Sequence, residues 1–248
     1  MNTIEALNIN INKKQFISIV GVGGKTTLLY RLSRELRKCN KRILLSTTTH
    51  IFIPPKDIYD DMYINSDRKA LLKYAESINK KGVFVIGSHI TDEEKIKGID
   101  ISLADELYNN HIFDFILVEA DGSKRKPIKA PANWEPMVPA NTTINIGVIG
   151  LDSIGMIANE ENVHRLDEFC FITQCSLGDV INEIMLAKLI NHPQGLFKNT
   201  PSKAKKIVLL NKADNVNMVE LGKTIGKMIE TDNTTIIIAS LENNRYWM

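Results

Sequence analysis

The chain has 248 residues, of which 44% are hydrophobic and 24% are charged, and its formal net charge is +2. These values are typical of a soluble globular protein, and so small a net charge gives no reason to expect nucleic acid or an acidic membrane surface as a partner. We expect neither a secretory signal nor a membrane span, because no apolar run approaches the roughly 20 residues that cross a bilayer. Three cysteines are too few for a disulfide framework, so we expect a cytoplasmic location.

Apolar runs of strand length alternate with helical patterns along most of the chain. The run at 16–20 predicts a strand, and the segment after it predicts a helix with one apolar side formed by Leu28, Leu29, Leu32 and Leu36. Further strands are predicted from Arg42 onward, at 83–87, at 113–122 with an end near Glu119, at 143–150, at 206–214 and at 234–241. Further helices are predicted at 66–80 with Ser66 as N-cap, after a capping box at 91–94, at roughly 178–191, and between the last two strands.

The predicted strands are continuous apolar runs rather than alternating ones. Such runs are typical of strands that are covered on both faces, as in a parallel sheet. We therefore predict one α/β domain over residues 1–248, with a mostly parallel sheet and helices on both faces. Two segments depart from this pattern: a proline- and lysine-rich stretch at 121–143, which we expect to be a functional or mobile loop, and an irregular insertion at 152–175.

A glycine-rich stretch, GVGGKTT, lies between the first predicted strand and the first predicted helix. In that position the backbone N–H groups of the turn and the helix N-terminus form a site for phosphates, so the chain is P-loop NTPase-like. Lys25 is expected against the β- and γ-phosphates, and the Thr26 hydroxyl on Mg²⁺. The usual motif has a further glycine where this chain has Ile19, and a glycine turn before an ordinary helix is the alternative. The predicted nucleotide-binding residues are Gly21, Val22, Gly23, Gly24, Lys25, Thr26 and Thr27.

Polar side chains follow two other predicted strands. Glu119 and Asp121 come at the carboxyl end of an apolar strand, which is the edge where ligands bind in open α/β sheets. Because they are two residues apart, both should point the same way, and a carboxylate there can hold Mg²⁺ or orient water. An acidic turn after a core strand is the alternative. Thr47, Thr48 and Thr49 could also reach the metal or the γ-phosphate, although threonine is ordinary strand composition.

The sequence NKAD at 211–214 follows the strand predicted before it and matches the NKxD signature with which GTPases bind guanine. The Asp214 carboxylate would accept from guanine N1–H and the 2-amino group, two donors that adenine lacks, so an unpaired carboxylate would reject ATP. Lys212 would lie along the base and Asn211 at its edge or on a neighbouring loop. The strand that follows places Ala239 and Ser240 where GTPases contact the base through their backbone.

Together these motifs resemble the YqeC family, proteins associated with selenium-dependent molybdenum hydroxylases. The resemblance covers nearly the whole chain and includes VGVGGKTTL, STTTHIF, VEADGSKRKPIKAP, EPMVP, GVIGLDSIG, VHR, HPQGLFK and LLNKAD. It implies a cytoplasmic P-loop protein that matures a molybdenum enzyme or handles its cofactor, selenium or sulfur, with family motifs at 21–27, 47–49, 119–124 and 211–214. The glycine loop is also similar to that of Mur-type ligases, which use ATP, so ATP stays open as the nucleotide.

Other polar residues have weaker assignments. A basic loop follows Asp121 and could bind a phosphate-bearing cofactor or be solvated surface; it contains Lys124, Arg125, Lys126 and Lys129. His164 and Arg165 could face the γ-phosphate, face a partner, or form a surface pair. Cys170 and Cys175 could be a metal, sulfur or selenium site, although buried free cysteine is common. We expect His192 to be a helix-terminus residue.

The leading hypothesis is a Mg²⁺-dependent GTP-binding protein that hydrolyses GTP slowly. Lys25, Glu119 and Asp121 are its predicted catalytic residues, and its predicted metal ligands are Thr26, Glu119 and Asp121. A conformational change in the 121–143 loop would then control a partner enzyme or its cargo. The first rival is an ATP-dependent ligase- or kinase-like enzyme that modifies a cofactor, and the second is a nucleotide-gated scaffold that hydrolyses nothing.

Overall fold

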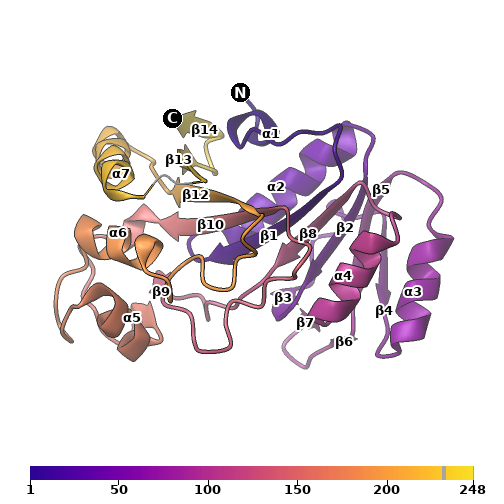
Figure 1. The fold of residues 1–248 in the computed structure, drawn as a ribbon, viewed down its shortest axis with the longest axis horizontal. Coiled ribbons are helices and arrows are strands. Elements are labelled where there is room, and N and C mark those ends of the chain that lie inside the picture. The colour runs from indigo at the N-terminus through magenta and orange to yellow at the C-terminus, as the bar shows by residue number, and fades with distance from the viewer. Residues whose placement is uncertain (231–232, 248) are drawn as a thin grey trace.

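A nine-stranded sheet runs through the centre of the protein (Figure 1). The computed structural model describes residues 1–230 and 233–247. Within this part of the chain every pairing in the sheet is parallel, except that the last strand joins the edge antiparallel to its neighbour. In spatial order the strands are β14 (Arg245–Trp247), β13 (Thr234–Ser240), β12 (Lys205–Asn211), β10 (Ile144–Gly150), β1 (Gln15–Gly21), β8 (Phe115–Glu119), β2 (Arg42–Thr47), β5 (Gly82–Gly87) and β4 (Asp61–Ile64).

Two small sheets and seven α-helices complete the described part of the fold. An antiparallel sheet contains β3 (His50–Phe52), β7 (Lys95–Lys97) and β6 (His89–Ile90), and a parallel pair contains β9 (Ile128–Lys129) and β11 (Val163–His164). The helices are α1 (Thr3–Ala6), α2 (Lys25–Lys38), α3 (Arg68–Ser77), α4 (Ile101–Asn109), α5 (Leu166–Thr173), α6 (Glu183–Asn191) and α7 (Val216–Met228), with a 3₁₀ turn η1 (Leu151–Ser153). None of the helices in the described residues has the length and apolarity needed to cross a bilayer.

Alternate residues of the central strands point to opposite faces, and each face has its own apolar core. On one face Ile17 and Ile19 of β1 pack with the α2 leucines, which are fully buried at positions Leu28, Leu29, Leu32 and Leu36. On the other face α3 and α4 cover β2, β5 and β8, while α6 and α7 cover β10, β12 and β13 with α5 beside α6. Figure 1 shows these two groups of helices at opposite ends of the sheet.

The predicted α/β class is confirmed: the sheet is mostly parallel and has helices on both faces. The predicted strands end close to where the structure ends them, for example at Glu119 and Gly150. The order of the strands did not follow from the sequence and comes from the structure alone. That residues 1–248 form a single domain stays a prediction.

Several predicted boundaries were wrong. The capping box at 91–94 starts no helix, because Thr91 N–H donates to Lys95 O at 2.8 Å across the β6–β7 hairpin and Glu94 has φ +55°. Helix α3 is capped by Asp67 instead of Ser66, since the Asp67 side chain accepts from the N–H of Lys69. The helix expected from 178 begins at Glu183, after the cap Asn182. The insertion at 152–175 is less irregular than expected, because it contains η1, β11 and α5.

Candidate functional site

Parallel pairing brings the carboxyl ends of four strands to one edge of the sheet. Between β1 and β8 the register pairs Ile19 with Glu119, and between β10 and β12 it pairs Gly150 with Asn211. The glycine loop, the acidic residues and NKAD therefore come from neighbouring strands at the edge where α/β sheets bind ligands. The three motifs are neighbours in the fold: Asn211 donates to the Gly23 carbonyl over a separation of 188 residues, and the Gly21 N–H donates to Asp121 over a separation of 100 residues.

The glycine loop connects β1 to α2 and has no room for a side chain at Gly23 or Gly24. Gly23 and Gly24 have φ of +93° and +136°. A Cβ on Gly23 would lie 2.4 Å from the backbone nitrogen of Gly150, and a Cβ on Gly24 would lie 2.3 Å from Nδ2 of Asn211. Only glycine readily adopts such φ values while its backbone comes this close to Gly150 of β10 and Asn211 of β12. The glycine loop therefore packs directly against the ends of these two strands.

The N-terminus of α2 is open to an anion. Its N-cap, Gly24, offers no side-chain acceptor, and the first turn contains no acidic residue. In residues 1–230 and 233–247 no hydrogen bond occupies the backbone N–H groups of 23–26. Free N–H groups at a helix N-terminus together with the helix dipole attract phosphate groups. The loop therefore has the donors that a phosphate cradle needs.

Lys25 lies in a buried group with the carboxylates of Glu119 and Asp121. Its Nζ is 2.5 Å from Asp121 Oδ1, 2.6 Å from the Asp121 carbonyl and 3.4 Å from Glu119 Oε1. The Thr26 hydroxyl donates to Glu119 Oε2 at 3.1 Å. Both carboxylates point toward the P-loop lysine, and a threonine hydroxyl beside a carboxylate is the type of oxygen pair that Mg²⁺ accepts in nucleotide sites.

Burial and charge act in opposite directions on these groups. Burial alone would lower the pKa of Lys25, but the carboxylates of Asp121 and Glu119 outweigh it and raise that pKa above its usual value. Burial also raises the pKa of Glu119, although Lys25 opposes the shift. For Asp121 the two lysines beside it, Lys25 and Lys129, outweigh burial and lower the pKa. Asp121 is therefore the firmly ionised carboxylate, and Glu119 is the more basic one.

A chain of buried ion pairs continues from Asp121 away from the glycine loop. Lys129, only 3% exposed, lies 2.9 Å from Asp121 and 3.0 Å from Glu135. Glu135 accepts from Arg165 through Nη2 at 2.9 Å and Nε at 3.2 Å. The pairing of β9 with β11 holds Lys129 beside His164. Glu135 was not singled out as a site residue from the sequence, although it begins the EPMVP segment that carries part of the family resemblance.

Glu135→Gln is expected to destabilise the fold by about 3 kcal/mol, because it leaves the buried Lys129 ammonium with one carboxylate partner instead of two, in addition to the Gly122 carbonyl at 2.8 Å. Urea unfolding of the variant and the native chain measures this difference. Glu220→Gln is the matched control, since Glu220 pairs with Lys223 at 2.7 Å on the surface and should cost less than about 1 kcal/mol. If Glu135→Gln and Glu220→Gln lower the free energy of unfolding by the same amount, the buried ion pairs contribute no more to stability than the surface pair.

The basic loop is divided between the interior and the solvent. Lys129 is buried in the ion-pair chain, whereas Lys124 and Arg125 are exposed. Arg125 stacks over the Phe52 ring at 4.5 Å, and Lys126 donates to the carbonyls of Glu160 and Val163. Of the four predicted basic residues, only Lys129 contacts a predicted site residue in the described part of the chain.

The threonines at the carboxyl end of β2 and directly after it have structural partners. The Thr47 hydroxyl donates to the Glu119 carbonyl at 2.7 Å, and the Thr48 hydroxyl donates to the Met137 carbonyl at 2.9 Å. Thr49 lies 3.2 Å from Thr47 through their hydroxyl oxygens. These contacts tie β2 to the end of β8 and to the 121–143 loop. A role of Thr48 or Thr49 toward a metal stays a prediction.

The NKAD residues are fixed on the glycine loop and on β13. Asn211 donates from Nδ2 to the Gly23 carbonyl at 2.7 Å and accepts from the N–H of Leu241 at 3.0 Å. The exposed Asp214 carboxylate accepts from the Ser240 hydroxyl at 2.5 Å. Asn211 thus joins the base-binding motif to the phosphate loop, and Ser240 orients the carboxylate predicted to bind guanine.

Asp152, which lies in the GVIGLDSIG segment, is a second residue that was not singled out as a site residue from the sequence. Its Oδ2 lies 2.6 Å from Nζ of Lys212, while its buried Oδ1 has no hydrogen-bond partner among the described residues. A Cβ on Gly150 would lie 2.5 Å from that Oδ1 and 3.2 Å from the Cα of Gly23. Asp152 therefore lies beside the glycine loop and holds Lys212, which has φ +64°.

His164 is buried beside Arg165 and Lys129. Burial, and to a smaller extent these two positive charges, lower the pKa of His164 to about 4. Because the unfolded chain would protonate this histidine near pH 6.5, the unfolded state binds more protons between pH 6.5 and 4, and stability falls as the pH falls through this window.

His164→Gln is expected to reduce this loss by about 2 kcal/mol between pH 7 and 4.5. Urea unfolding at pH 7 and at pH 4.5 gives the free energy of unfolding at each pH, and the difference between the two is this loss. If His164→Gln loses as much stability as the native chain between pH 7 and 4.5, the lowered pKa of His164 is wrongly assigned.

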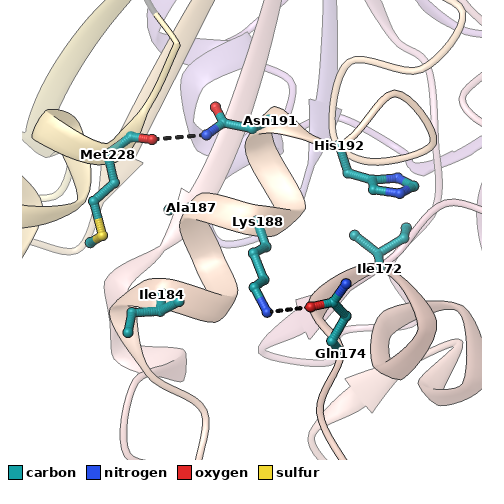
Figure 2. Close-up of a pocket in the computed structure, with 8 residues that line it drawn as sticks. All are labelled: Ile172, Gln174, Ile184, Ala187, Lys188, Asn191, His192 and Met228. Atoms are coloured by element: carbon teal, nitrogen blue, oxygen red, sulfur yellow. Dashed lines mark hydrogen bonds between the residues drawn. The ribbon is translucent and has the colours of Figure 1, made fainter.

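A cavity of ≈ 380 Å³ lies away from these residues, between α5 and α6. Figure 2 shows its lining, which includes Lys188 and His192. His192 is the C-cap of α6, as expected for a helix-terminus residue. None of the residues that line the cavity was singled out for nucleotide binding, metal binding or catalysis.

The fold and the strand–glycine-loop–helix arrangement define a P-loop NTPase-like α/β protein. Comparison with known proteins then gives its family: the model described as "YqeC protein" matches residues 17–167. The chain is 35% identical over 196 residues to "Uncharacterized protein YqeC" of Escherichia coli (strain K12), covering 79% of this chain and 75% of that protein. The chain belongs to the YqeC family, which confirms the resemblance predicted from its motifs. The family match includes the glycine loop and Arg165 but ends before NKAD at 211–214.

Proposed function

We propose that this protein binds a Mg²⁺–nucleotide at the carboxyl edge of β1, β8 and β12, prefers GTP to ATP, and hydrolyses it slowly. The observation that carries the proposal is the 2.7 Å hydrogen bond from Asn211 to the Gly23 carbonyl. It joins the NKAD motif, which resembles the guanine-binding motif of GTPases, to the loop whose backbone N–H groups are free, so that one nucleotide would contact both.

The residues around the loop fit this ligand. The free N–H groups of 23–26 would bind phosphate oxygens, and Lys25 would exchange Asp121 for the β- and γ-phosphates. Thr26 and Glu119 would hold Mg²⁺, which takes one or two protein oxygens and completes its shell with phosphate oxygens and water. The metal would neutralise charge on the phosphates during transfer.

Glu119 is the carboxylate best suited to orient or deprotonate the attacking water. Burial raises its pKa, and a more basic carboxylate is the better proton acceptor. Asp121, with its lowered pKa, serves as the counter-ion of Lys25 and Lys129. This division of roles fits slow hydrolysis, because Glu119 is shared between metal binding and water activation.

The biological role is proposed from the family resemblance alone. We propose that nucleotide binding serves the maturation of a selenium-dependent molybdenum hydroxylase or its cofactor, in the cytoplasm. The 121–143 loop is the segment through which a partner would sense the nucleotide, because it starts at Asp121 and contains Lys129 and Glu135 of the ion-pair chain.

Calorimetric titration of the full chain with GTP and ATP, with and without Mg²⁺, tests the nucleotide. We expect GTP to bind at least about tenfold more tightly than ATP and to lose affinity without Mg²⁺. ATP preference would overturn the guanine assignment and favour the ligase- or kinase-like alternative. Phosphate release from GTP, followed over hours, tests hydrolysis, and its complete absence would favour the scaffold.

A further inference from the structure

Two of the three cysteines lie side by side at the end of α5. Cys170 is on the helix, and Cys175 follows Gln174, whose left-handed backbone (φ +59°) reverses the chain. The Sγ atoms are 3.5 Å apart, with the Cys175 thiol donating to Cys170. The remaining cysteine, Cys39, is exposed at the C-terminus of α2.

The segment that contains the pair faces solvent. Both cysteines are half-buried, and their neighbours Phe171 and Leu177 are 74% and 72% exposed. A small reagent can therefore reach the thiols without opening the core. Neither cysteine belongs to the candidate nucleotide site, so that site gives no reason for two adjacent thiols at this position.

The turn between the two thiols is held from α6. Lys188 donates from Nζ to the carbonyl of Thr173 at 3.0 Å and to Oε1 of Gln174 at 2.9 Å. Figure 2 shows Lys188 reaching across the cavity wall to Gln174. Both acceptors lie between the cysteines in the sequence. The turn is thus fixed in a conformation that keeps the Sγ atoms close, which lowers the entropy cost of joining them.

We propose that Cys170 and Cys175 form a reversible intramolecular disulfide by exchange with a low-molecular-weight disulfide. The Cys175 thiolate attacks one sulfur of that disulfide, which forms a mixed disulfide and releases one thiol. Cys170 then loses its proton and attacks Sγ of Cys175, which releases the second thiol. In total the two cysteines lose two electrons and two protons, and the external disulfide takes up both to become two thiols.

The order of attack follows from the environments of the thiols. Burial raises the pKa of Cys170 to about 11, so this thiol is protonated at neutral pH and is the poorer first nucleophile. Once a mixed disulfide is on Cys175, Cys170 is adjacent to the sulfur that it attacks. Closure would then fix the turn that Lys188 binds and with it one wall of the cavity between α5 and α6.

Oxidised glutathione and the full-length Cys39→Ser protein test the proposal. After incubation and alkylation of free thiols, trypsin should release the peptide 166–188, which contains both cysteines and no internal lysine or arginine. We expect this peptide to lose two hydrogens and to take up no alkyl group. Dithiothreitol should restore the two alkylated cysteines.

Single-cysteine variants distinguish closure from simple adduct formation. In the same background Cys170→Ser should accumulate glutathione on Cys175, and Cys175→Ser should react at least roughly tenfold more slowly at pH 8. Equal rates would overturn the assigned order of attack. A glutathione adduct that persists on Cys175 when both cysteines are present, or a disulfide between two copies of the chain, would overturn the proposal. Circular dichroism of each variant verifies that the fold is retained.

Discussion

Replacing Lys25 with methionine is expected to lower the affinity for Mg²⁺–nucleotide by roughly 100-fold, because a charge-assisted hydrogen bond to phosphate is lost. The same change should destabilise the nucleotide-free fold by about 3 kcal/mol, since Asp121 and Glu119 would lose the buried ammonium that lies 2.5 and 3.4 Å from them. Calorimetry with GTP and urea unfolding measure the two effects separately.

The double variant Lys25→Met with Glu119→Gln separates binding from folding. Removing one carboxylate together with the lysine restores the charge balance of the buried group, and Asp121 keeps its ion pair with Lys129 at 2.9 Å, so much of the stability should return. Nucleotide affinity should stay low, because the ammonium that would bind the phosphates is still missing. If Lys25→Met binds nucleotide as tightly as the native chain, the phosphate cradle is wrongly assigned.

The parts of the site that the sequence predicted are those set by local geometry. A strand, a glycine turn and a helix in succession fix where Lys25 and the free N–H groups lie, whatever the rest of the chain does. Likewise the period of two along an extended chain places Glu119 and Asp121 on the same side, and the structure brings both to Lys25.

The parts that the sequence did not predict depend on contacts between distant segments. The contact between Arg165 and Glu135 forms only because β9 pairs with β11, which brings Arg165 to the 121–143 loop. Asp152 contacts Lys212 only because β10 and β12 are neighbours, an order that no local pattern encodes.

The helix start predicted from the capping box at 91–94 was wrong for the same reason, because a local pattern does not include contacts with other segments. Thr91 and Glu94 have the types that start a helix, but their backbone groups pair across the β6–β7 hairpin. A short polar pattern indicates only which local structures a segment can adopt. The packing of β7 against β3 selects the hairpin.

Asp214→Asn is expected to lower GTP affinity by roughly 100-fold and to leave ATP affinity nearly unchanged. The carboxylate would accept from guanine N1–H and the 2-amino group, whereas an amide offers one acceptor and places N–H donors against guanine donors. Because Asp214 is exposed and its described contact is with Ser240, the variant should keep the native fold. Competition titrations with both nucleotides give the GTP/ATP ratio.

Xanthosine triphosphate makes this test specific to the base. Xanthine has a carbonyl where guanine has the 2-amino group, so the asparagine amide can donate to it, and Asp214→Asn should bind this nucleotide more tightly than GTP. Ser240→Ala is the matched control, because it keeps the carboxylate and removes the hydroxyl that orients it at 2.5 Å. It should weaken GTP binding only several-fold and should not favour xanthine. If Asp214→Asn leaves the GTP/ATP ratio unchanged and gains nothing with xanthosine triphosphate, the base lies elsewhere, and the contact between Asn211 and Gly23 serves only to support the glycine loop.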